Sequence, residues 1–280
     1  MTTRAETIAK TTAVFNSAAD YFDHPVLDFW DRFGQQTIDR LSLTLGDRVL
    51  DVCCGTGASA IPSALRVGPT GQVLGADLAE SLLELARQKS QQKGLKNITF
   101  QVGDFEHLGL PDASFDAVVS VFGIFFVPDM VAATQELWRM VRPGGQLAIT
   151  SWGNKIFEPA TQFFWEAIEA ERPDLCKKFT PWERISQPNS LKALLESGGA
   201  TQVEVLAENA LHPLSSPEDW WTMILGGGLR GTIDQLTPEE KARLRQANLG
   251  YLQNNHIQTL ESEVLYAIAQ KQTEYNTARV

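Results

Sequence analysis

Apolar residues in the first 45 positions recur every three or four residues, which is the spacing that gathers side chains on one face of a helix. Leu27, Trp30 and Phe33 follow this spacing in the segment FNSAADYFDHPVLDFWDRFGQQTIDRLSL. Pro25 suits the first turn of a helix, where a backbone N–H would have no helical partner in any case. The pattern therefore predicts a helical N-terminal cap over residues 1–45.

From residue 46 the pattern changes to short apolar runs that alternate with segments of helical spacing. The apolar runs are RVLDVCC, GQVLGADL, NITFQVGD, FDAVVSVFGIFF and QLAITSWG, and the helical segments between them are ASAIPSALRVG, AESLLELARQKSQQKG and MVAATQELWRMVRPGG. Strands that alternate with helices predict a parallel sheet with helices on both faces. Because crossover connections are right-handed, the carboxyl ends of such strands lie along one edge.

The last third of the chain has a longer and less regular pattern. The segments expected there are an amphipathic helix over 157–179, a helix over 190–200, a strand over 201–207 and a final strand over 263–271. The two strands are separated by far more than the roughly 2–5 residues of a hairpin loop. Ser216 before Pro217, and Thr237 before Pro238, are pairs that begin capped helices. We therefore expect 208–262 to be a helical insertion that forms a lid over a substrate site.

Composition and charge narrow the class of protein. The 280 residues are 43% hydrophobic and 21% charged, with a net charge of −10. This acidic balance argues against nucleic acid as a partner, because phosphate binding needs clustered lysine and arginine. No apolar run reaches the roughly 20 residues of a membrane helix, and the N-terminus lacks a secretory signal, so we expect a cytoplasmic protein without integral membrane contact. Cys53, Cys54 and Cys176 lack the spacing of a metal site, and no metal is expected.

Four motifs fall at the ends of successive predicted strands. They are DVCCGTG, with Asp51, Gly55 and Gly57; the end of QVLGAD, with Asp77; VGDFEHL, with Asp104 and Phe105; and SVFGIFF, with Ser120 and Phe122. An acidic residue about 20 positions after a glycine turn is placed to accept hydrogen bonds from ribose hydroxyls. Taken singly, each aspartate is also a common turn or helix-cap residue. The four motifs in this order predict a nucleoside-binding site at the sheet edge.

The glycine turn indicates which kind of nucleoside is bound. A dinucleotide site uses three glycines to seat a pyrophosphate on a helix N-terminus. Here Cys53 replaces the first glycine, and Ser59 with Ala60 stands where the third would fall. A ligand with an amino-acid tail needs a carboxylate near its ammonium group instead, and Asp51 is placed to supply it.

The motifs that carry a family resemblance are VLDVCCGTG, GADLAESLLELAR, ITFQVGDFEHLGLPDASFDAVVS and ELWRMVRPGGQLAITSWG. They resemble the successive motifs of class I S-adenosylmethionine-dependent methyltransferases, in particular the ubiquinone/menaquinone C-methyltransferase-like branch. The resemblance implies an α/β, Rossmann-like fold with a seven-stranded, mostly parallel sheet whose last strand is antiparallel. The expected units are the N-terminal cap 1–45, the cofactor-binding core 46–207, the insertion 208–262 and the last strand with its tail 263–280.

The resemblance also implies roles for individual residues toward S-adenosylmethionine, which becomes S-adenosylhomocysteine. Asp51, Cys53, Gly55 and Gly57 would line the methionine moiety; Asp77 would bind the ribose and Leu78 the adenine; Asp104, with Phe105 beside it, would hold the adenine amino group; Ser120 and Phe122 would lie beneath the sulfonium; and Tyr21 would cover the cofactor. The sequence departs from many relatives in GIFFVPD, which has no histidine at Phe125 or Phe126.

The methyl acceptor is expected to be a small apolar or aromatic molecule, because aromatic residues gather near the expected entrance. The pocket candidates are Trp30, Phe125, Trp152, Trp220 and Trp221, although any one of these rings could instead anchor the cap to the core. His24 and His212 are the candidate general bases, each with the alternative of a purely structural role. Two other functions stay open: a nicotinamide-dependent oxidoreductase, and a protein that binds S-adenosylmethionine without catalysis.

Overall fold

The computed structural model describes residues 4–176 and 180–273. The strands are β1 (Arg48–Val52), β2 (Gln72–Asp77), β3 (Ile98–Val102), β4 (Phe115–Val121), β5 (Val141–Trp152), β6 (Val203–Pro213) and β7 (Thr259–Gln270). The α-helices are α1 (Arg4–Phe22), α2 (Phe29–Asp39), α3 (Ala60–Val67), α4 (Glu80–Gln92), α5 (Met130–Met140), α6 (Ala160–Glu171), α7 (Pro188–Ser197), α8 (Pro217–Leu225), α9 (Arg230–Ile233) and α10 (Pro238–Asn254). Short 3₁₀ helices are η1 (Pro25–Leu27), η2 (Phe105–His107), η3 (Ile124–Phe126), η4 (Pro173–Leu175) and η5 (Pro181–Ile185).

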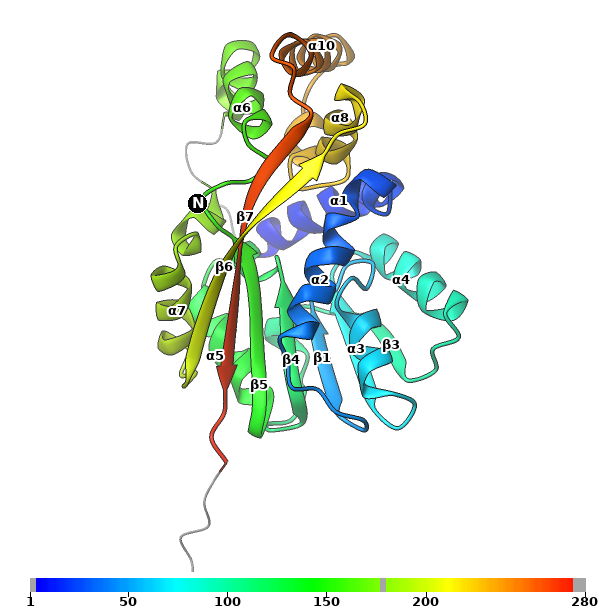
Figure 1. Ribbon diagram of the computed structural model, residues 1–280, viewed down its shortest axis with the longest axis vertical. Coiled ribbons are helices and arrows are strands. Elements are labelled where there is room, and N and C mark those ends of the chain that lie inside the picture. The colour runs from blue at the N-terminus through cyan, green and yellow to red at the C-terminus, as the bar shows by residue number, and fades with distance from the viewer. Residues whose placement is uncertain (1–3, 177–179, 274–280) are drawn as a thin grey trace, which may run out of the picture.

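One seven-stranded sheet organises the described chain, in the order β3-β2-β1-β4-β5-β7-β6. Strands β1 to β5 are parallel, whereas β7 is antiparallel to both β5 and β6. The expected sheet, with its antiparallel last strand, is confirmed (Figure 1). The strand order reverses between β1 and β4, and an open parallel sheet binds ligands at such a reversal point.

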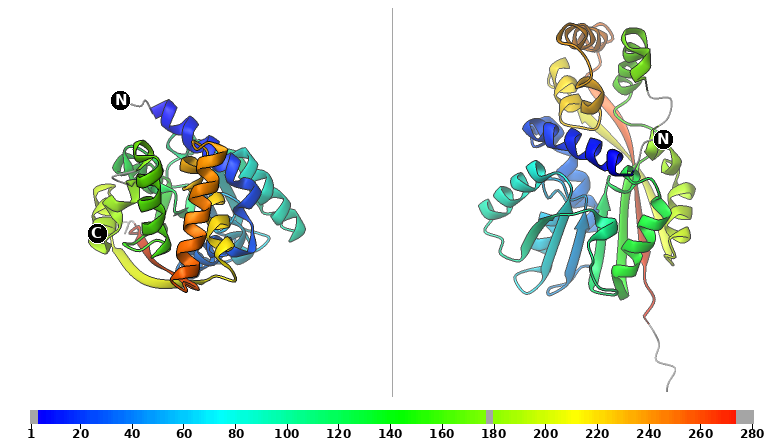
Figure 2. Two further views of the ribbon diagram at one scale, coloured as in Figure 1. Left: turned by 90° about the horizontal axis from the view of Figure 1, so that it is seen from above. Right: turned by 180° about the vertical axis from the view of Figure 1, so that it is seen from behind.

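Strand residues alternate between two apolar layers, as the period of two requires. Val49 and Val119 point to the layer that α2, α3 and α4 cover, and Leu50 and Val118 point to the layer that α5 and α7 cover. Figure 2 shows α5 and α7 on the face that is hidden in Figure 1. Both faces are covered, which explains why these strands read as continuous apolar runs in the sequence.

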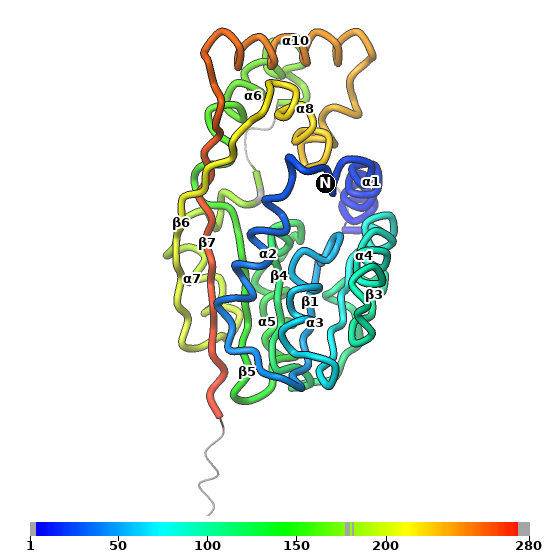
Figure 3. The backbone as a smooth tube through the Cα atoms, turned by 45° about the vertical axis from the view of Figure 1, so that its right-hand side comes forward, coloured from blue at the N-terminus to red at the C-terminus, as the bar shows by residue number. Residues whose placement is uncertain are grey.

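Strands β6 and β7 continue past the other strands as a two-stranded ribbon (Figure 3). The ribbon carries α8, α9 and α10, which are called the cap from here on. They pair without interruption from Val203 with Ala269 to Pro213 with Thr259. The outer edges of the predicted insertion, residues 208–213 and 259–262, are therefore strand. Only 214–258 forms the excursion with α8, α9 and α10. Much of this part of β6 is exposed, so it lacks the apolar run that marks a strand in sequence.

Two other elements differ from the sequence expectations. Helix α6 ends at Glu171 rather than at 179, because Pro173 disfavours a helical conformation in the residue before it; residues 177–179 lie outside the described part. Strand β5 begins at Val141 and so includes the VRPGG segment, with a register shift opposite Phe115 and Ala117. Within the described ranges, no helix is long and apolar enough to cross a membrane.

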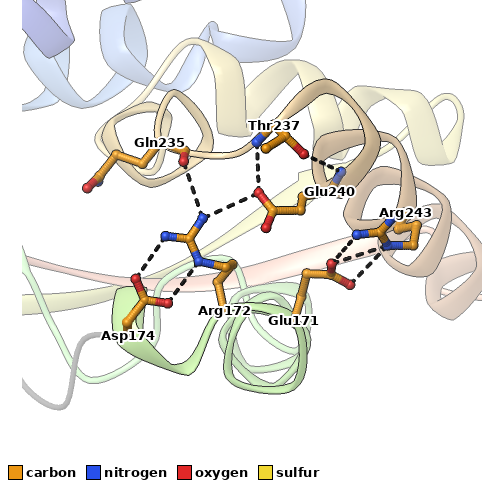
Figure 4. Close-up of polar contacts among 7 residues, drawn as sticks. All are labelled: Glu171, Arg172, Asp174, Gln235, Thr237, Glu240 and Arg243. Atoms are coloured by element: carbon orange, nitrogen blue, oxygen red, sulfur yellow. Dashed lines mark hydrogen bonds and ion pairs between the residues drawn. The ribbon is translucent and has the colours of Figure 1, made fainter.

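The cap is fastened by a polar network between the end of α6 and the start of α10 (Figure 4). Arg172 donates to both carboxylate oxygens of Asp174 at 2.8 Å and lies 3.3 Å from Glu240. Glu240 also completes the capping box of α10 with Thr237. These contacts hold α6, which follows β5 in sequence, against the excursion 214–258.

Candidate functional site

The sequence-predicted polar residues meet at the carboxyl edge of the sheet. Asp51 of β1 is in register with Gly75 of β2 and Val119 of β4, which places it at the reversal of strand order. Asp77 ends β2, and Asp104 follows β3 by two residues. Helix α1 lies across this same edge (Figure 2). The edge therefore brings three carboxylates together beneath the N-terminal helix.

The turn after β1 is held in a conformation that normally favours glycine. Cys53 has a φ of 55°, beside Gly55 at 52° and Gly57 at 88°. The side chain of Cys53 fits because Gly123 faces it: a Cβ on Gly123 would lie 2.4 Å from the Cβ of Cys53. Cys53, at the position of the missing first glycine, thus keeps a left-handed backbone, and the space for its side chain comes from Gly123, which precedes η3. Burial raises the pKa of the Cys53 thiol, which keeps it protonated.

Asp51 is a buried carboxyl group with one oxygen left free. The Ser59 hydroxyl donates to Oδ2 at 2.7 Å, whereas Oδ1 is buried without a partner. Burial is the main reason that the pKa of Asp51 rises to about 7, with a smaller contribution from the nearby charge of Asp77. A cationic ligand group at Oδ1 would both complete the hydrogen bonding and favour the ionised form.

The raised pKa of Asp51 predicts how stability depends on pH. The folded protein keeps this proton up to about pH 7, whereas the unfolded chain releases it near 3.8. The folded state therefore binds more protons between these values, and this contribution to the free energy of unfolding falls as pH rises toward 7, by up to on the order of 4 kcal/mol. We expect Asp51→Asn to flatten the decline between pH 5 and pH 8 relative to the wild type. Urea unfolding of both proteins at pH 5 and at pH 8 measures the decline in the free energy of unfolding. An equal decline in the wild type and in Asp51→Asn would contradict a protonated Asp51.

Asp77 holds the glycine turn through its own carboxylate. Its Oδ2 accepts from the backbone N–H of Gly55 at 2.9 Å, and its Oδ1 accepts from that of Ala79 at 2.9 Å. Burial raises the pKa of Asp77, and the two N–H donors oppose this shift. Asp77 thus joins the end of β2, the turn after β1 and the start of α4, which is the structural role that was its alternative; its role toward a ribose stays a prediction. Leu78, the next residue, is half-buried.

Asp104 is engaged by the first described residue of α1. Its carboxylate caps η2 by accepting from the backbone N–H of Glu106 at 3.2 Å, and it forms an ion pair with Arg4. Arg4 also lies 2.6 Å from Glu106. Farther along α1, Asn16 accepts from the backbone N–H of Ser81 at 2.9 Å. Helix α1 therefore spans the edge from η2 to α4, a contact that sequence spacing gave no means of finding.

Aromatic rings fill the region between this edge and the cap. Phe122, at the end of β4, stacks on Trp152 of β5 with ring centroids 4.1 Å apart. Trp30 lies 5.6 Å from Phe122 and 6.0 Å from Trp152. Seven rings between the sheet edge and β6 form what we call the aromatic cluster: Phe29, Trp30, Phe33, Phe122, Trp152, Phe157 and His212. The indole N–H of Trp30 and the hydroxyl of Ser120 are buried without partners at this edge.

The other predicted pocket residues border the aromatic cluster or lie beyond it, and the ring centroid of Trp220 is 6.4 Å from that of Phe157. Trp220 of α8 is 1% exposed and donates to Asn248 of α10 at 3.0 Å, so it holds these two helices together. Trp221 is also buried, and Phe125 packs on Trp182 of η5. Of the pocket candidates, Trp30 and Trp152 lie together in the aromatic cluster.

The ring nearest the glycine turn is Phe22 rather than Tyr21. Phe22 lies 3.7 Å from where a Cβ on Gly55 would stand, and it stacks on Trp30 with centroids 5.4 Å apart. The Tyr21 ring instead lies beneath Arg230 of α9. Phe105, predicted beside the adenine, is buried at the start of η2.

The two candidate histidines differ sharply. His24 is exposed and accepts from the backbone N–H of Val26 at 3.3 Å, so it caps η1, as its structural alternative required. His212 is buried on β6 within the aromatic cluster, where its Nδ1 lies 3.0 Å from the Arg32 guanidinium and its Nε2 has no partner. Burial, helped by Arg32, lowers the pKa of His212 to about 3. His212 therefore stays neutral at physiological pH.

A separate hollow of about 550 Å³ lies on the outside of the cap, lined by residues of α6 and α10 that include Phe163, Arg243 and Tyr251. The rings of Phe163 and Tyr251 stack there at 4.0 Å. Its lining includes none of the strand-end carboxylates, so we place the functional site at the sheet edge and not in this hollow.

Comparison with known proteins finds a family and several relatives for this chain. Residues 49–145 match the family described as "Methyltransferase domain". The chain is 36% identical over 140 residues to aklanonic acid methyltransferase from Streptomyces sp. strain C5, covering 50% of this chain and 64% of that protein. It is 38% identical over 117 residues to demethylmenaquinone methyltransferase from Listeria welshimeri, covering 42% and 50%. The chain thus spans about half to two thirds of these relatives. A solved putative methyltransferase from Bacillus halodurans shares the fold, with a TM-score of 0.57, 21% identity, and 86% and 99% coverage.

Proposed function

Because residues 49–145 belong to the class I S-adenosylmethionine-dependent methyltransferases, we propose that the chain transfers a methyl group from S-adenosylmethionine to a small molecule. The observation that carries this proposal is the free Oδ1 of Asp51, buried at the reversal of strand order beside the glycine turn. It suits a ligand whose amino-acid tail brings an ammonium group to this point. S-adenosylmethionine, when bound, supplies a methyl group on a positively charged sulfur.

In this proposal, different residues at the sheet edge bind different parts of the cofactor. In this proposal Asp51, Cys53, Gly55 and Gly57 line the methionine part, Asp77 and Leu78 hold the ribose and adenine, Asp104 and Phe105 meet the adenine edge, and Ser120 and Phe122 lie at the sulfonium side. Tyr21 stays a prediction, and Phe22 is the ring of α1 that lies against the glycine turn. Arg4 would exchange its ion pair with Asp104 when the adenine amino group arrives.

The surroundings favour an apolar, planar methyl acceptor. In-line methyl transfer needs an aligned nucleophile and the exclusion of water. The stacked rings of Phe122 and Trp152 supply a flat apolar wall, and aromatic faces also stabilise a nearby cation. Neither histidine is suited to act as a base, because His24 caps η1 and burial lowers the pKa of His212 to about 3, which makes it a weak base. We therefore propose an acceptor that is nucleophilic without a protein base, such as an ionised hydroxyl or an enolate carbon.

The proposed function predicts a selective response to nucleoside ligands. S-adenosylhomocysteine is expected to raise the Tm of the protein, whereas NAD(H) and NADP(H) are expected to leave it unchanged. The physical reason is that the turn offers a carboxylate for an ammonium group and lacks the glycine pattern that seats a pyrophosphate. Thermal unfolding monitored by circular dichroism measures the shift. Stabilisation by NADH without stabilisation by S-adenosylhomocysteine would favour the oxidoreductase alternative instead.

Methyl transfer itself is tested with labelled cofactor. The protein is incubated with S-adenosylmethionine that carries a tritiated methyl group and with a panel of phenols, hydroxyquinones and amines. Label in an apolar, oxygen-bearing acceptor supports the proposal. Cofactor binding with no transfer to any acceptor class would favour a binding protein without catalysis.

A further inference from the structure

The aromatic cluster contains a polar atom that the proposed function does not use. The Nε2 atom of His212 is buried and has no hydrogen-bond partner. The rings around it are apolar: Phe157 at 4.8 Å, Phe29 at 5.4 Å and Phe33 at 5.8 Å between centroids. A buried polar group without a partner is costly, so the free Nε2 atom calls for an explanation.

The contact with Arg32 decides what this atom can do. A guanidinium group has donors and no acceptor, so the Nδ1 of His212 must accept the hydrogen bond from Arg32 at 3.0 Å. In a neutral imidazole the proton then sits on Nε2. Nε2 is therefore a donor, turned away from Arg32, and it cannot take a proton from a substrate. This geometry excludes the general-base role that the sequence left open for His212.

A second unpartnered donor belongs to the same aromatic cluster. The indole N–H of Trp30 is buried without a partner. The rings of Trp30 and His212 both contact the ring of Phe29, with centroids 4.6 Å and 5.4 Å away. The described cluster thus holds two free donors and only apolar surface between them. A ligand that satisfies both needs oxygen acceptors on an otherwise apolar body.

Resting on the proposed function, we infer that the Nε2–H of His212 donates a hydrogen bond to an oxygen of the methyl acceptor and so selects oxygen-bearing planar rings. The acceptor class is then a phenol, quinone or ring ketone rather than a hydrocarbon or an amine. Selection follows because a molecule without the oxygen leaves the donor buried and unpaired, which is the strongest means that a binding site has for rejecting an analogue. His212 is in this sense a specificity-determining residue.

The test compares two probes that differ by one oxygen, 1-naphthol and naphthalene, on full-length protein saturated with S-adenosylhomocysteine. Calorimetric titration of the wild type is expected to show 1-naphthol binding about tenfold more tightly than naphthalene, the effect of one hydrogen bond. His212→Asn keeps an acceptor at the level of Nδ1 for Arg32 but is too short to place a donor at Nε2. We expect this variant to bind both probes about equally. His212→Gln carries its amide at the level of Nε2, and we expect it to restore most of the preference.

The outcomes separate this inference from a structural role and from the proposed function. An equal loss of both probes in His212→Asn and His212→Gln would mean that the residue only supports packing, and would overturn the inference. Absence of 1-naphthol binding to the wild type would overturn it as well. The dissociation constant of S-adenosylhomocysteine, measured in the same proteins, is expected to stay unchanged, because His212 lies on β6, away from the carboxylates. Failure of the wild type to bind S-adenosylhomocysteine would instead contradict the proposed function.

Discussion

Replacing Gly34 by alanine is expected to lower the free energy of unfolding by about 2–3 kcal/mol and to weaken the binding of S-adenosylhomocysteine by about tenfold or more. Gly34 lies in α2, where a Cβ would stand 2.3 Å from the carbonyl oxygen of Ala58 and 2.9 Å from the backbone nitrogen of Ser59. These are backbone atoms of the turn that precedes α3, and they cannot swing aside as a flexible side chain would. Either α2 or the turn must move, and both border the proposed cofactor site.

The chain offers a matched control for this substitution. Gly250 lies in α10, and a Cβ there would meet nothing within 4 Å. Gly250→Ala is expected to leave cofactor binding unchanged and to stabilise the fold by up to about 1 kcal/mol, through helix propensity alone. Urea unfolding and calorimetric titration of the two variants measure both effects. Wild-type stability and affinity in Gly34→Ala would show that the close approach of α2 to the turn is not required.

The Asp77→Ala variant is expected to bind S-adenosylhomocysteine at least about 100-fold more weakly than the wild type, because hydrogen bonds to a charged group are the strong ones. The carboxylate has two tasks in the proposed site. It would accept from the ribose hydroxyls, and it also holds the N–H of Gly55 at 2.9 Å, which fixes the glycine turn. Removing it therefore disrupts both the ligand contact and the shape of the turn.

Asp129 is the control for Asp77, because its carboxylate also accepts from two backbone N–H groups. Those groups belong to Val131 and Ala132 at the start of α5, at 3.1 Å and 3.0 Å. Asp129→Ala is expected to cost about 1 kcal/mol as the loss of a helix cap, with no change in affinity. Comparable affinities for S-adenosylhomocysteine in the two variants would remove Asp77 from the proposed site.

The sheet and its polar edge were predictable because they depend on local patterns. Continuous apolar runs marked β1 and β4, and the right-handed crossover rule then required Asp51, Asp77 and Asp104 to end at one edge. The structure places them there. The cap was predictable only as helical, because the pairs Ser-Pro and Thr-Pro show where a helix begins but not where it packs.

The parts that sequence reasoning missed all depend on contacts between distant positions. Cys53 was predicted to replace the first glycine of the turn, but the fit of its side chain depends on Gly123, a residue 70 positions later. The ion pair between Arg4 and Asp104 joins residues that lie 100 positions apart in the sequence. The donor role of His212 depends on Arg32, 180 positions earlier, which fixes the tautomer. No local period encodes such pairs, and the residue types alone left each role open.

The ribbon of β6 and β7 has a consequence for how this protein can diversify. Pro213 and Thr259 are paired, so the chain leaves for 214–258 and returns at neighbouring points. A segment whose ends are neighbours can be lengthened, shortened or replaced with little effect on the strands below it. His212 lies one residue inside the point where the excursion leaves β6, and it pairs with Leu260 of β7. A different excursion can therefore replace 214–258 while the strand-end carboxylates and His212 keep their positions.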